Sequence, residues 1–420
     1  MPQNRRSGKR NSSVKKHMNM SIFLTIVVIL VGVIFLCLGI YEYMRKQDIE
    51  VLARQKEEIE KQTLAIFSEI EDNISQTNQN ISESDEIIKM SAVGDILCGE
   101  GMIKDAYNES FGTYDFSHMF RKVSGYINKA DIIMGTMETN FTSGEYNDEN
   151  APQEFAKAVK NIGINIVTIS HNHSLDYGLQ GLKDTKACLE NLGYSVVGDR
   201  LNDNKKAVLI KNVKNTKIAF LTYTDSINNK SSKTKETIEA VSIYSEAQVK
   251  GDIAYAKDNG AEYIIVMIHW GDAISDKVNN EQKEMADFLV ENGVDMILGA
   301  HPSVVQPMEI RKNKEGKNVF IAYSIGTYIS TLADDNAKIE LVLNVELRKS
   351  GKDGEVYLNK VDYTPIYVLD NGKEAENRFE LIDMKSTATN YASGNTTDIS
   401  RETYDKLVKG LKKLEEMLAQ

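Results

Sequence analysis

Short apolar runs alternate with helix-like patterns along the chain from residue 87 onward. Two amphipathic stretches, Leu179–Leu192 and Glu281–Asn292, predict helices, and a glycine that favours a helix end follows each of them. Strands that alternate with helices predict a layered α/β domain. The predicted strands are Ile87–Val93, Asp131–Met137, Ile164–Ser170, Ser195–Val197, Ile218–Thr222, Tyr263–Ile268, Met296–Gly299, Val319–Tyr323, Ile339–Leu347 and Val356–Val368.

We expect this domain to span residues 87–370. The last part of the chain, residues 371–420, predicts a polar loop over Ser386–Thr397 and a closing helix over Arg401–Leu418. The closing helix has mixed charge, so we expect it to pack on the domain rather than to carry chemistry.

An apolar segment precedes the domain, since no charged residue occurs from Ser21 to Ile40. A helix of about 20 residues rises about 30 Å, which is the thickness of a bilayer core. We therefore predict a transmembrane helix over residues 21–41, with the lipid bilayer as a partner. A cleaved signal peptide is the alternative, although the run exceeds the usual length of about 7 to 15 residues and no small-x-small site follows it.

Residues 42–86 predict a helical stalk followed by a polar linker. Leu52, Ile59 and Ile66 recur every seven residues, but polar residues occupy the complementary heptad positions. A full coiled-coil seam is therefore not expected. The Asn- and Ser-rich stretch Glu71–Glu86 predicts a flexible spacer.

Charge is distributed unevenly along the chain. Residues 1–17 contain six basic residues and no acid, so the net charge of −11 leaves −17 for everything after them. The basic tail, residues 1–20, predicts a cytoplasmic N-terminus and an extracellular C-terminal domain at the cell membrane. The acidic remainder excludes nucleic acid as a partner, because phosphate binding needs clustered Lys and Arg. The three cysteines lie far apart and predict neither a disulfide framework nor a cysteine metal site.

Polar residues of metal-binding types follow five of the predicted strands, and four of the six histidines are among them. In an open α/β sheet, ligands bind beyond the carboxyl ends of the strands, so these five loops should converge on one pocket. Each feature alone also fits a turn residue, a solvated carboxylate or a hydrogen-bonded strand-end histidine. The five segments are Gly94-Asp95, Gly135-Thr136-Met137-Glu138, Ser170-His171-Asn172-His173, His269-Trp270-Gly271-Asp272 and Gly299-Ala300-His301.

Carboxylate, amide and imidazole groups can together hold one or two divalent cations, which lower the pKa of a bound water and clamp a phosphoryl oxygen. The sequence therefore predicts a site for phosphoester hydrolysis near neutral pH. After the third strand, Asp176 is expected to cap the following helix. His118 lies in an aromatic segment outside the pattern, and no role is assigned to it.

The ordered set of motifs resembles the bacterial CapA or PgsA capsule proteins over roughly Lys89 to Ser330. The resemblance implies a calcineurin-like metallophosphoesterase fold, which is a four-layer αββα sandwich, and a role in making or exporting poly-γ-glutamate at the cell surface. The motifs that carry it are Gly94-Asp95, the Glu138 segment, Asn172-His173 with Asp176-Tyr177-Gly178, His269-Trp270-Gly271, Gly299-Ala300-His301-Pro302 and Tyr323-Ser324-Ile325-Gly326.

Several positions depart from the family pattern. Thr136, Ser303 and Thr327 stand where the family usually has Asn, His and Asn, His171 replaces the first Asn of the Asn-Asn-His motif, and Asp272 is the nearest acid after His-Trp-Gly. A neutral hydroxyl at Ser303 is a poor ligand, which weakens one of two metal sites. We therefore expect at most one tightly bound divalent ion, of Mn, Mg, Zn or Fe.

The resemblance also implies roles for individual residues. It implies His173 as general acid and Asp95 as a second catalytic residue, while His171 is either an extra ligand or points away from Asn172. Its implied metal ligands are Asp95, Glu138, Asn172, His269 and His301.

Three functions remain open from the sequence. The first is a membrane-anchored accessory protein for biosynthesis or export of a capsular polymer, with the polymer or its precursor and membrane synthase subunits as partners. The second is an active metal-dependent phosphoesterase that acts on a cell-envelope substrate. The third is a catalytically degenerate scaffold of a membrane synthase complex.

Overall fold

The computed structural model describes residues 28–29, 31–40, 43, 47, 82 and 84–418, apart from residues 128, 203 and 396–398. The chain forms two compact units, residues 1–57 and 58–420. In the first unit, residues 31–40 are helical. Within the described residues, no helix combines the length and apolar character needed to cross a bilayer. Residues 21–27, 30 and 41 of the predicted span, the whole tail 1–20 and nearly all of the stalk 42–86 lie outside the described residues, so these assignments stay predictions.

The second unit contains a seven-stranded mixed sheet with strand order β15-β14-β13-β1-β4-β5-β6. Strand β1 is parallel to β4 and antiparallel to β13, so a parallel half and an antiparallel half meet at β1. The strands are β1 (Glu86–Ile96), β4 (Ile132–Met137), β5 (Ile166–Thr168), β6 (Ser195–Val197), β13 (Ile339–Lys349), β14 (Val356–Asp370) and β15 (Phe379–Asp383).

A six-stranded sheet has strand order β11-β12-β10-β9-β8-β7. Its four central strands run parallel, and β7 and β11 are antiparallel at the two edges. The strands are β7 (Val208–Val213), β8 (Thr216–Thr224), β9 (Tyr263–His269), β10 (Met296–Ala300), β11 (Met308–Lys312) and β12 (Asn318–Ala322).

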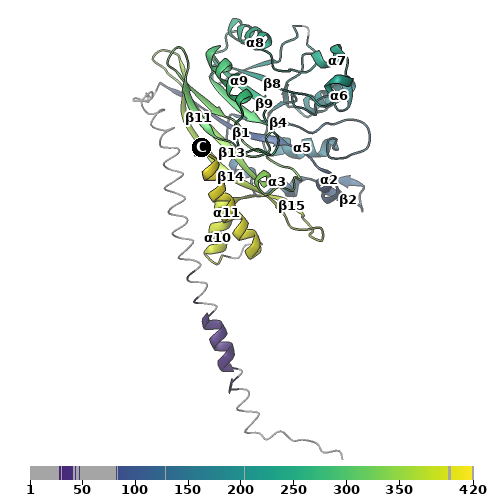
Figure 1. The fold of residues 1–420 in the computed structure, drawn as a ribbon, viewed down its shortest axis with the longest axis vertical. Helices are drawn as coiled ribbons and strands as arrows, with labels where there is room; N and C mark the ends of the chain where they lie inside the picture. The colour runs from purple at the N-terminus through teal and green to yellow at the C-terminus, as the bar shows by residue number, and fades with distance from the viewer. Residues whose placement is uncertain are drawn as a thin grey trace, which may run out of the picture. The chain divides into compact units, whose positions relative to one another are not determined.

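The strands bury side chains on both faces, which is why their sequences read as continuous apolar runs. Ile133 and Val167 face a core beneath the helices of the seven-stranded sheet, and Ile264 and Val266 face a second core beneath the helices of the other sheet. Alternate residues such as Met134, which is fully buried, therefore point between the two sheets. The layers are helices, sheet, sheet and helices, with α8 and α9 beyond one sheet and α2 and α3 beyond the other (Figure 1).

Helices connect the parallel strands, as in repeated βαβ units. Helices α5 (Gln153–Asn161) and α6 (Gly178–Asn191) connect β4 to β5 and β5 to β6, and α8 (Glu246–Asp258) and α9 (Asn280–Glu291) connect β8 to β9 and β9 to β10. The shorter elements are α2 (Glu100–Ala106), β2 (Tyr107–Asn108), β3 (Thr113–Tyr114), α3 (Ser117–Phe120), α4 (Ser124–Ile127), η1 (Lys230–Ser232), α7 (Lys235–Glu239) and η2 (Asn336–Lys338).

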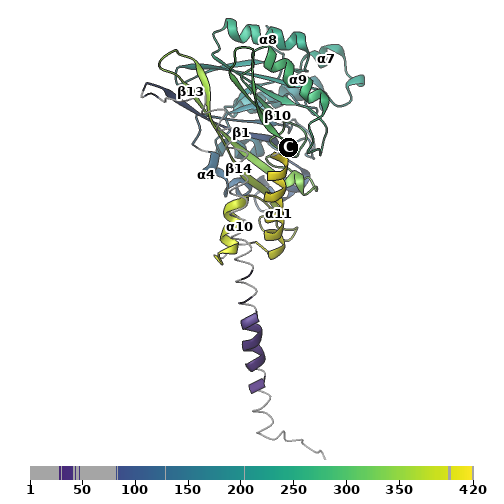
Figure 2. The same ribbon diagram turned by 60° about the vertical axis from the view of Figure 1, so that its left-hand side comes forward.

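The predicted polar loop over Ser386–Thr397 is wrong in its first part, because α10 (Met384–Ala392) occupies it. The Asp383 carboxylate accepts a hydrogen bond from the Ser386 backbone N–H at 2.7 Å and so caps this helix. Residues 396–398 lie outside the described residues. Strand β15 pairs with β14, so the sheet continues past the predicted domain end at residue 370. The closing helix α11 (Arg401–Leu418) has the predicted bounds and lies beside α10 (Figure 2).

Candidate metal centre

The predicted strand-end residues meet at one place between the two sheets. Asp95 lies near the end of β1, Glu138 directly follows β4, His269 is the last residue of β9, and His301 directly follows β10. These four strands are parallel within their sheets, so their carboxyl ends share an edge. One sheet supplies both carboxylates and the other supplies both imidazoles.

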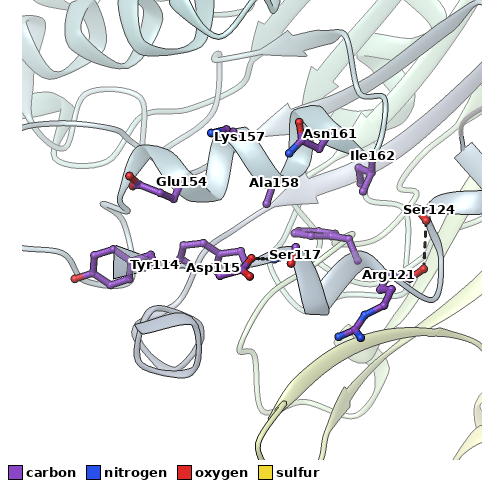
Figure 3. A pocket seen from close by; sticks show the side chains of 12 residues that line it. Tyr114, Asp115, Ser117, Arg121, Ser124, Glu154, Lys157, Ala158, Asn161 and Ile162 are labelled. Carbon is purple, nitrogen blue, oxygen red and sulfur yellow. Dashed lines mark hydrogen bonds between the residues drawn. The ribbon is translucent and has the colours of Figure 1, made fainter. Parts of the chain in front are cut away.

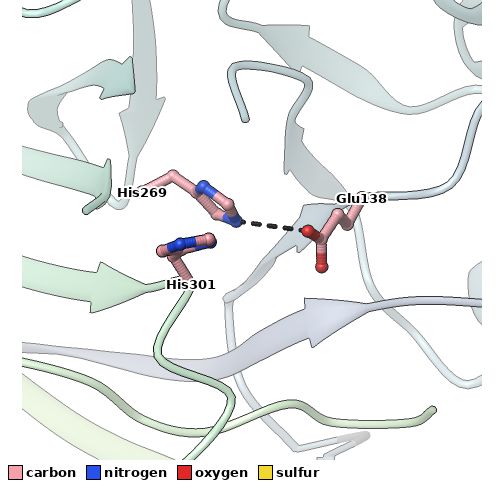
Figure 4. Close-up of side chains that lie close together, drawn as sticks. All are labelled: Glu138, His269 and His301. Carbon is pink, nitrogen blue, oxygen red and sulfur yellow. Dashed lines mark ion pairs between the residues drawn. The ribbon is translucent and has the colours of Figure 1, made fainter. Parts of the chain in front are cut away.

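Glu138, His269 and His301 each direct one ligand atom toward a common point, and these atoms all lie within 4.8 Å of one another (Figure 4). His269 Nε2 is 3.6 Å from Glu138 Oε1 and 3.4 Å from Asp95 Oδ1. The rings of His269 and His301 are 4.6 Å apart between centroids. Four ionisable side chains therefore surround one small buried volume.

Unpaired polar atoms show that this group of residues fits a divalent cation. Within the described part of the chain, Asp95 Oδ1, Asn172 Oδ1 and His269 Nε2 are buried without a hydrogen-bond partner. Buried polar atoms normally find partners, because an unmade hydrogen bond costs about 1–3 kcal/mol. Carboxylate, amide and imidazole atoms are all ligand types that Mn, Fe or Zn ions accept.

The backbone at His301 is held in a strained conformation. Its φ is +92°, a region that non-glycine residues rarely adopt. The His301 N–H donates to Asp95 Oδ2 at 2.8 Å, which secures this conformation and also orients the carboxylate. Strain of this kind persists where surrounding contacts enforce it and is frequent at functional sites. Asp95 thus couples the end of β1 to the His301 ring.

Burial and mutual charge set the protonation states of the site. Burial raises the pKa of Asp95, and the neighbouring Glu138 carboxylate raises it further. Burial opposes a charge on His269, but the Asp95 and Glu138 carboxylates raise its pKa to about 10. Burial and the nearby His269 lower the pKa of His301 to about 4. In the metal-free chain at neutral pH, His269 is therefore protonated and His301 is neutral.

Metal affinity should rise with pH because of His269. Its nitrogen can bind a cation only after the imidazole loses the proton, which it holds up to a pKa of about 10. Binding should therefore release about one proton, and the apparent affinity should increase about tenfold per pH unit between about pH 7 and 9. Calorimetric titration with Mn²⁺ in buffers of different ionisation enthalpy measures the released proton. Equal Mn²⁺ affinities at about pH 7 and about pH 9 would show that His269 is not a ligand.

His173 lies beside this centre and is paired with Asp176. His173 Nδ1 is 2.6 Å from Asp176 Oδ2 and 3.1 Å from Asn228 Nδ2. Burial works against its charge, yet the Asp176 carboxylate raises the pKa of His173 above its usual value. A protonated, partly exposed imidazole here can donate a proton. The predicted capping role of Asp176 is wrong, because the N-cap residue of α6 is Tyr177, which makes no side-chain cap, and Asp176 pairs with His173 instead.

His171 and Asn172 occupy the wall of the site. The His171 ring is 6.0 Å from the His269 ring between centroids, and burial lowers its pKa to about 3. His171 lies outside the group whose ligand atoms come within 4.8 Å of one another. Asn172 Nδ2 donates to Asn228 Oδ1 at 3.3 Å, so Asn172 Oδ1 is the side-chain atom that could bind a cation.

The substituted positions contribute little to the centre. Ser303 Oγ donates to the carbonyl oxygen of His301 at 3.2 Å, which is a local contact within one loop. Thr327 Oγ1 is buried and has no hydrogen-bond partner in the described part of the chain. Neither hydroxyl supplies the imidazole or amide that the family resemblance implies at these positions.

Sequence reasoning missed three buried or partly buried groups beside the site. Asp225 follows β8, its N–H donates to the His269 carbonyl oxygen at 3.0 Å, and its Oδ2 accepts from the Gly271 N–H at 2.9 Å. Asn228 contacts both Asn172 and His173. Glu340 on β13 is fully buried, which raises the pKa of its carboxyl, as does the nearby Asp95. The polar residues that follow β8 could have identified Asp225 and Asn228 from the sequence. Glu340 lies inside an apolar strand, so no sequence pattern marked it as part of the site.

A second hollow of about 350 Å³ lies between α3 and α5 (Figure 3). Its charged lining side chains are Asp115, Arg121, Glu154 and Lys157, so their charges balance. The Asp115 carboxylate accepts from the Ser117 N–H at 2.9 Å, which is a local turn contact. The convergent ionisable groups are therefore at the strand-end centre and not in this hollow.

Comparisons with known proteins agree with the motif pattern. The family described as "Bacterial capsule synthesis protein PGA_cap" matches residues 89–332, a range that contains every residue of the centre. The capsule biosynthesis protein CapA of Bacillus anthracis is 30% identical over 280 residues, which cover 63% of this chain and 65% of that protein. The PGA biosynthesis protein CapA of Bacillus subtilis is 27% identical over 278 residues, which cover 64% of this chain and 70% of that protein.

Solved structures resemble this chain more distantly. The NAD nucleotidase NadN of Haemophilus influenzae has a TM-score of 0.41 and 16% identity, with 80% of this chain and 61% of that chain covered. The calcineurin-like phosphoesterase YfkN of Bacillus subtilis has a TM-score of 0.38 and 13% identity, with 80% and 100% covered. The sequence matches carry the assignment and confirm the resemblance to CapA proteins: the chain belongs to the bacterial capsule synthesis protein PGA_cap family.

Proposed function

We propose that this protein is an accessory component for biosynthesis or export of a capsular polymer of the poly-γ-glutamate type. In this proposal the predicted helix over residues 21–41 anchors it in the cell membrane, and the α/β domain, a calcineurin-like αββα sandwich, acts outside the cell. Membership of a capsule synthesis family supports the pathway. The charge of the N-terminal tail supports the topology.

One observation carries the role of the pocket: Glu138, His269 and His301 come from three different strand ends and converge within 4.8 Å. Burying such groups together without a ligand is costly, so their arrangement favours a bound cation. A bound divalent ion would supply a Lewis acid for a phosphoryl or carboxyl oxygen. Glu138, His269 and His301 would hold it, with Asp95 and Asn172 completing the set, and His173 would deliver a proton at the exposed side.

An active hydrolase of a cell-envelope substrate is the second candidate. The pairing of His173 with Asp176 favours it, because the carboxylate raises the pKa of the imidazole and so favours the protonated form that can act as an acid. A degenerate scaffold that assembles membrane synthase subunits is the third candidate. Ser303 and Thr327 favour it, because hydroxyls replace two ligand types at the site.

Replacing Glu138 or His301 by alanine in cells should reduce surface polymer by about tenfold or more, because loss of a direct ligand weakens metal binding at least that much. Surface polymer is assayed chemically, and immunoblotting checks that each variant accumulates to the normal level. His118→Ala is a matched control, since His118 is also buried but pairs with Asp105 away from the centre. Normal polymer in both site variants would leave the scaffold as the surviving function.

Turnover separates the first two candidates. The purified full-length chain is incubated with an aryl phosphate and Mn²⁺, and the Glu138→Ala chain serves as the blank. Hydrolysis that disappears in this variant would identify a phosphoesterase. Absence of hydrolysis, combined with loss of polymer in cells, would leave the pocket as a binding site in the polymer pathway.

A further inference from the structure

Helix α11 carries a cluster of lysines in a chain whose net charge is strongly negative. Lys406, Lys409, Lys412 and Lys413 follow one another at intervals of one to three residues, and spacings of three, four and seven place side chains on one helical face. The first three are exposed and Lys413 is partly buried. The opposite face of the helix is apolar and packs on the domain through residues that include Leu407, Leu411 and Leu414.

These four lysines line one groove of about 610 Å³, which we call the lysine groove. The facing wall is formed by Tyr367 on β14 and by Asp335 beside η2. Among the described lining residues, four lysines stand against two acids, Asp335 and Glu416. Asp335 pairs with Lys338 at 3.5 Å, so Glu416 is the one acid among the described lining residues that has no ion pair there, and the excess of lysine charge selects an anionic ligand.

Two of the lysines are available for such a ligand. Lys406 pairs with Glu402 at 2.9 Å and Lys413 pairs with Asp276 at 2.8 Å, which neutralises both. Lys409 and Lys412 have no ion pair within the part of the chain that the structure describes, and both are exposed. Their ammonium groups lie on flexible stems, so they can follow carboxylates along a chain without fixed geometry.

The lysine groove is connected to the metal centre through one loop. Asp276, the partner of Lys413, belongs to the loop that follows His269. In the same loop, the Ile274 N–H donates to the carbonyl oxygen of Pro302 at 2.8 Å, and Pro302 is the residue after His301. The groove therefore borders, through Lys413 and Asp276, the loop that follows His269, and this loop is hydrogen-bonded to the residue next to His301.

An anionic membrane surface is a weaker match for this helix. Helices that lie on membranes insert an apolar face beside their basic residues. Here the apolar face of α11 is already buried in the domain, and the lysines line a concave groove. The observations favour an extended polymer with repeated carboxylates over a lipid headgroup layer.

We propose that the lysine groove binds a segment of a polycarboxylate chain, with Lys409 and Lys412 as its principal contacts. The identification of this chain as the capsular polymer rests on the proposed function. The groove then holds the polymer next to the loop that follows His269, and it supplies the local positive charge that an acidic domain needs to retain a polyanion.

The test uses the purified full-length chain and a fluorescent poly-γ-glutamate oligomer, with binding followed by anisotropy at low ionic strength. The double variant Lys409→Glu/Lys412→Glu should weaken binding by about tenfold or more, because it replaces attraction by like-charge repulsion. The double variant Lys409→Gln/Lys412→Gln should weaken it less. Raising the salt concentration should weaken wild-type binding most, since exposed charges are screened.

The matched control is Lys183→Glu/Lys283→Glu, which makes the same change in net charge at exposed positions on α6 and α9. It should bind the oligomer nearly as wild type does. If both glutamate variants weaken oligomer binding equally, net charge alone would explain the weakening and the proposal would be overturned. Unchanged binding in the Lys409/Lys412 variants would also overturn it.

Two further arms separate this proposal from its neighbours. Vesicles of phosphatidylcholine with and without phosphatidylserine test whether the groove binds an anionic membrane. If the Lys409/Lys412 substitutions weaken binding to phosphatidylserine vesicles but not to the oligomer, the polymer proposal is overturned. The oligomer assay with the Lys409/Lys412 variants tests the groove separately from the pocket, because the groove does not contain Glu138. Normal capsule in Glu138→Ala cells would thus count against the proposed function of the pocket while leaving the groove result intact.

Discussion

Replacing His269 by alanine should abolish tight divalent-metal binding, with a fall in affinity of about 100-fold or more. His269 Nε2 lies within 3.6 Å of both Asp95 and Glu138, so its loss removes the central nitrogen donor of the set. Changes to groups that only support a ligand already cost about 10–100-fold, and loss of the ligand itself should exceed that. Metal content after dialysis against Mn²⁺, measured by elemental analysis of the full-length chain, checks the result.

The control for this experiment is His118→Ala. His118 is also nearly buried, but its Nε2 pairs with Asp105 at 2.9 Å, outside the centre. This variant should retain the metal at the wild-type level. Retention of the metal by the His269→Ala chain as well would mean that the converging side chains do not form the site.

Replacing Asp252 by alanine should destabilise the α/β domain by about 3–5 kcal/mol. Asp252 on α8 is fully buried, and both of its oxygens bind Arg200, whose side chain is 5% exposed. Tyr223 on β8 also donates to Asp252 Oδ2 at 3.1 Å. Loss of the carboxylate leaves the guanidinium buried without its counter-charge, which is why the expected cost is large. Urea unfolding followed by tryptophan fluorescence reports on the domain, since the chain's one tryptophan, Trp270, is fully buried.

Two comparisons make the Asp252 result specific. The double variant Arg200→Met/Asp252→Leu should be less destabilised than Asp252→Ala, because it removes both charges and fills the space with apolar atoms. Lys104→Ala breaks an exposed pair with Glu100 and should change stability by less than about 1 kcal/mol. If Asp252→Ala unfolds at the same urea concentration as Lys104→Ala, the buried pair does not stabilise the domain.

Much of the fold follows from local patterns. The runs at Ser195–Val197 and Arg401–Leu418 have the same bounds in the structure, because apolar periodicity and the adjacent glycine and turn residues define them. The segment Met384–Ala392 was missed because its composition is polar, and its helix depends on the cap from Asp383 and on packing against α11. The stacking of Tyr391 on Tyr404, with ring centroids 4.7 Å apart, is a tertiary contact that no local pattern encodes.

Part of the candidate site could also be predicted from local sequence patterns. Asp95, Glu138, His269 and His301 each lie at or next to the end of a strand, and the rule that parallel strands share a carboxyl edge brings Asp95 to Glu138 and His269 to His301. The packing of the two sheets, which brings the two pairs together, is not set by that rule. The sequence could not predict the pairing of His173 with Asp176, because an aspartate before a helix has the same sequence signature whether it caps the helix or binds a side chain. Glu340 was hidden because its environment depends on how β13 packs near β1.

The donor atoms of the metal centre belong to two separately hydrogen-bonded sheets. Asp95 and Glu138 are carried by one sheet, and His269 and His301 by the other. Backbone ladders fix spacings within a sheet, whereas the separation between sheets depends on interior side chains such as Met134 and Phe220, both fully buried. The thickness of that interior layer therefore governs how far apart these candidate ligand atoms lie, so a substitution within the layer would change the size of ion that fits between them.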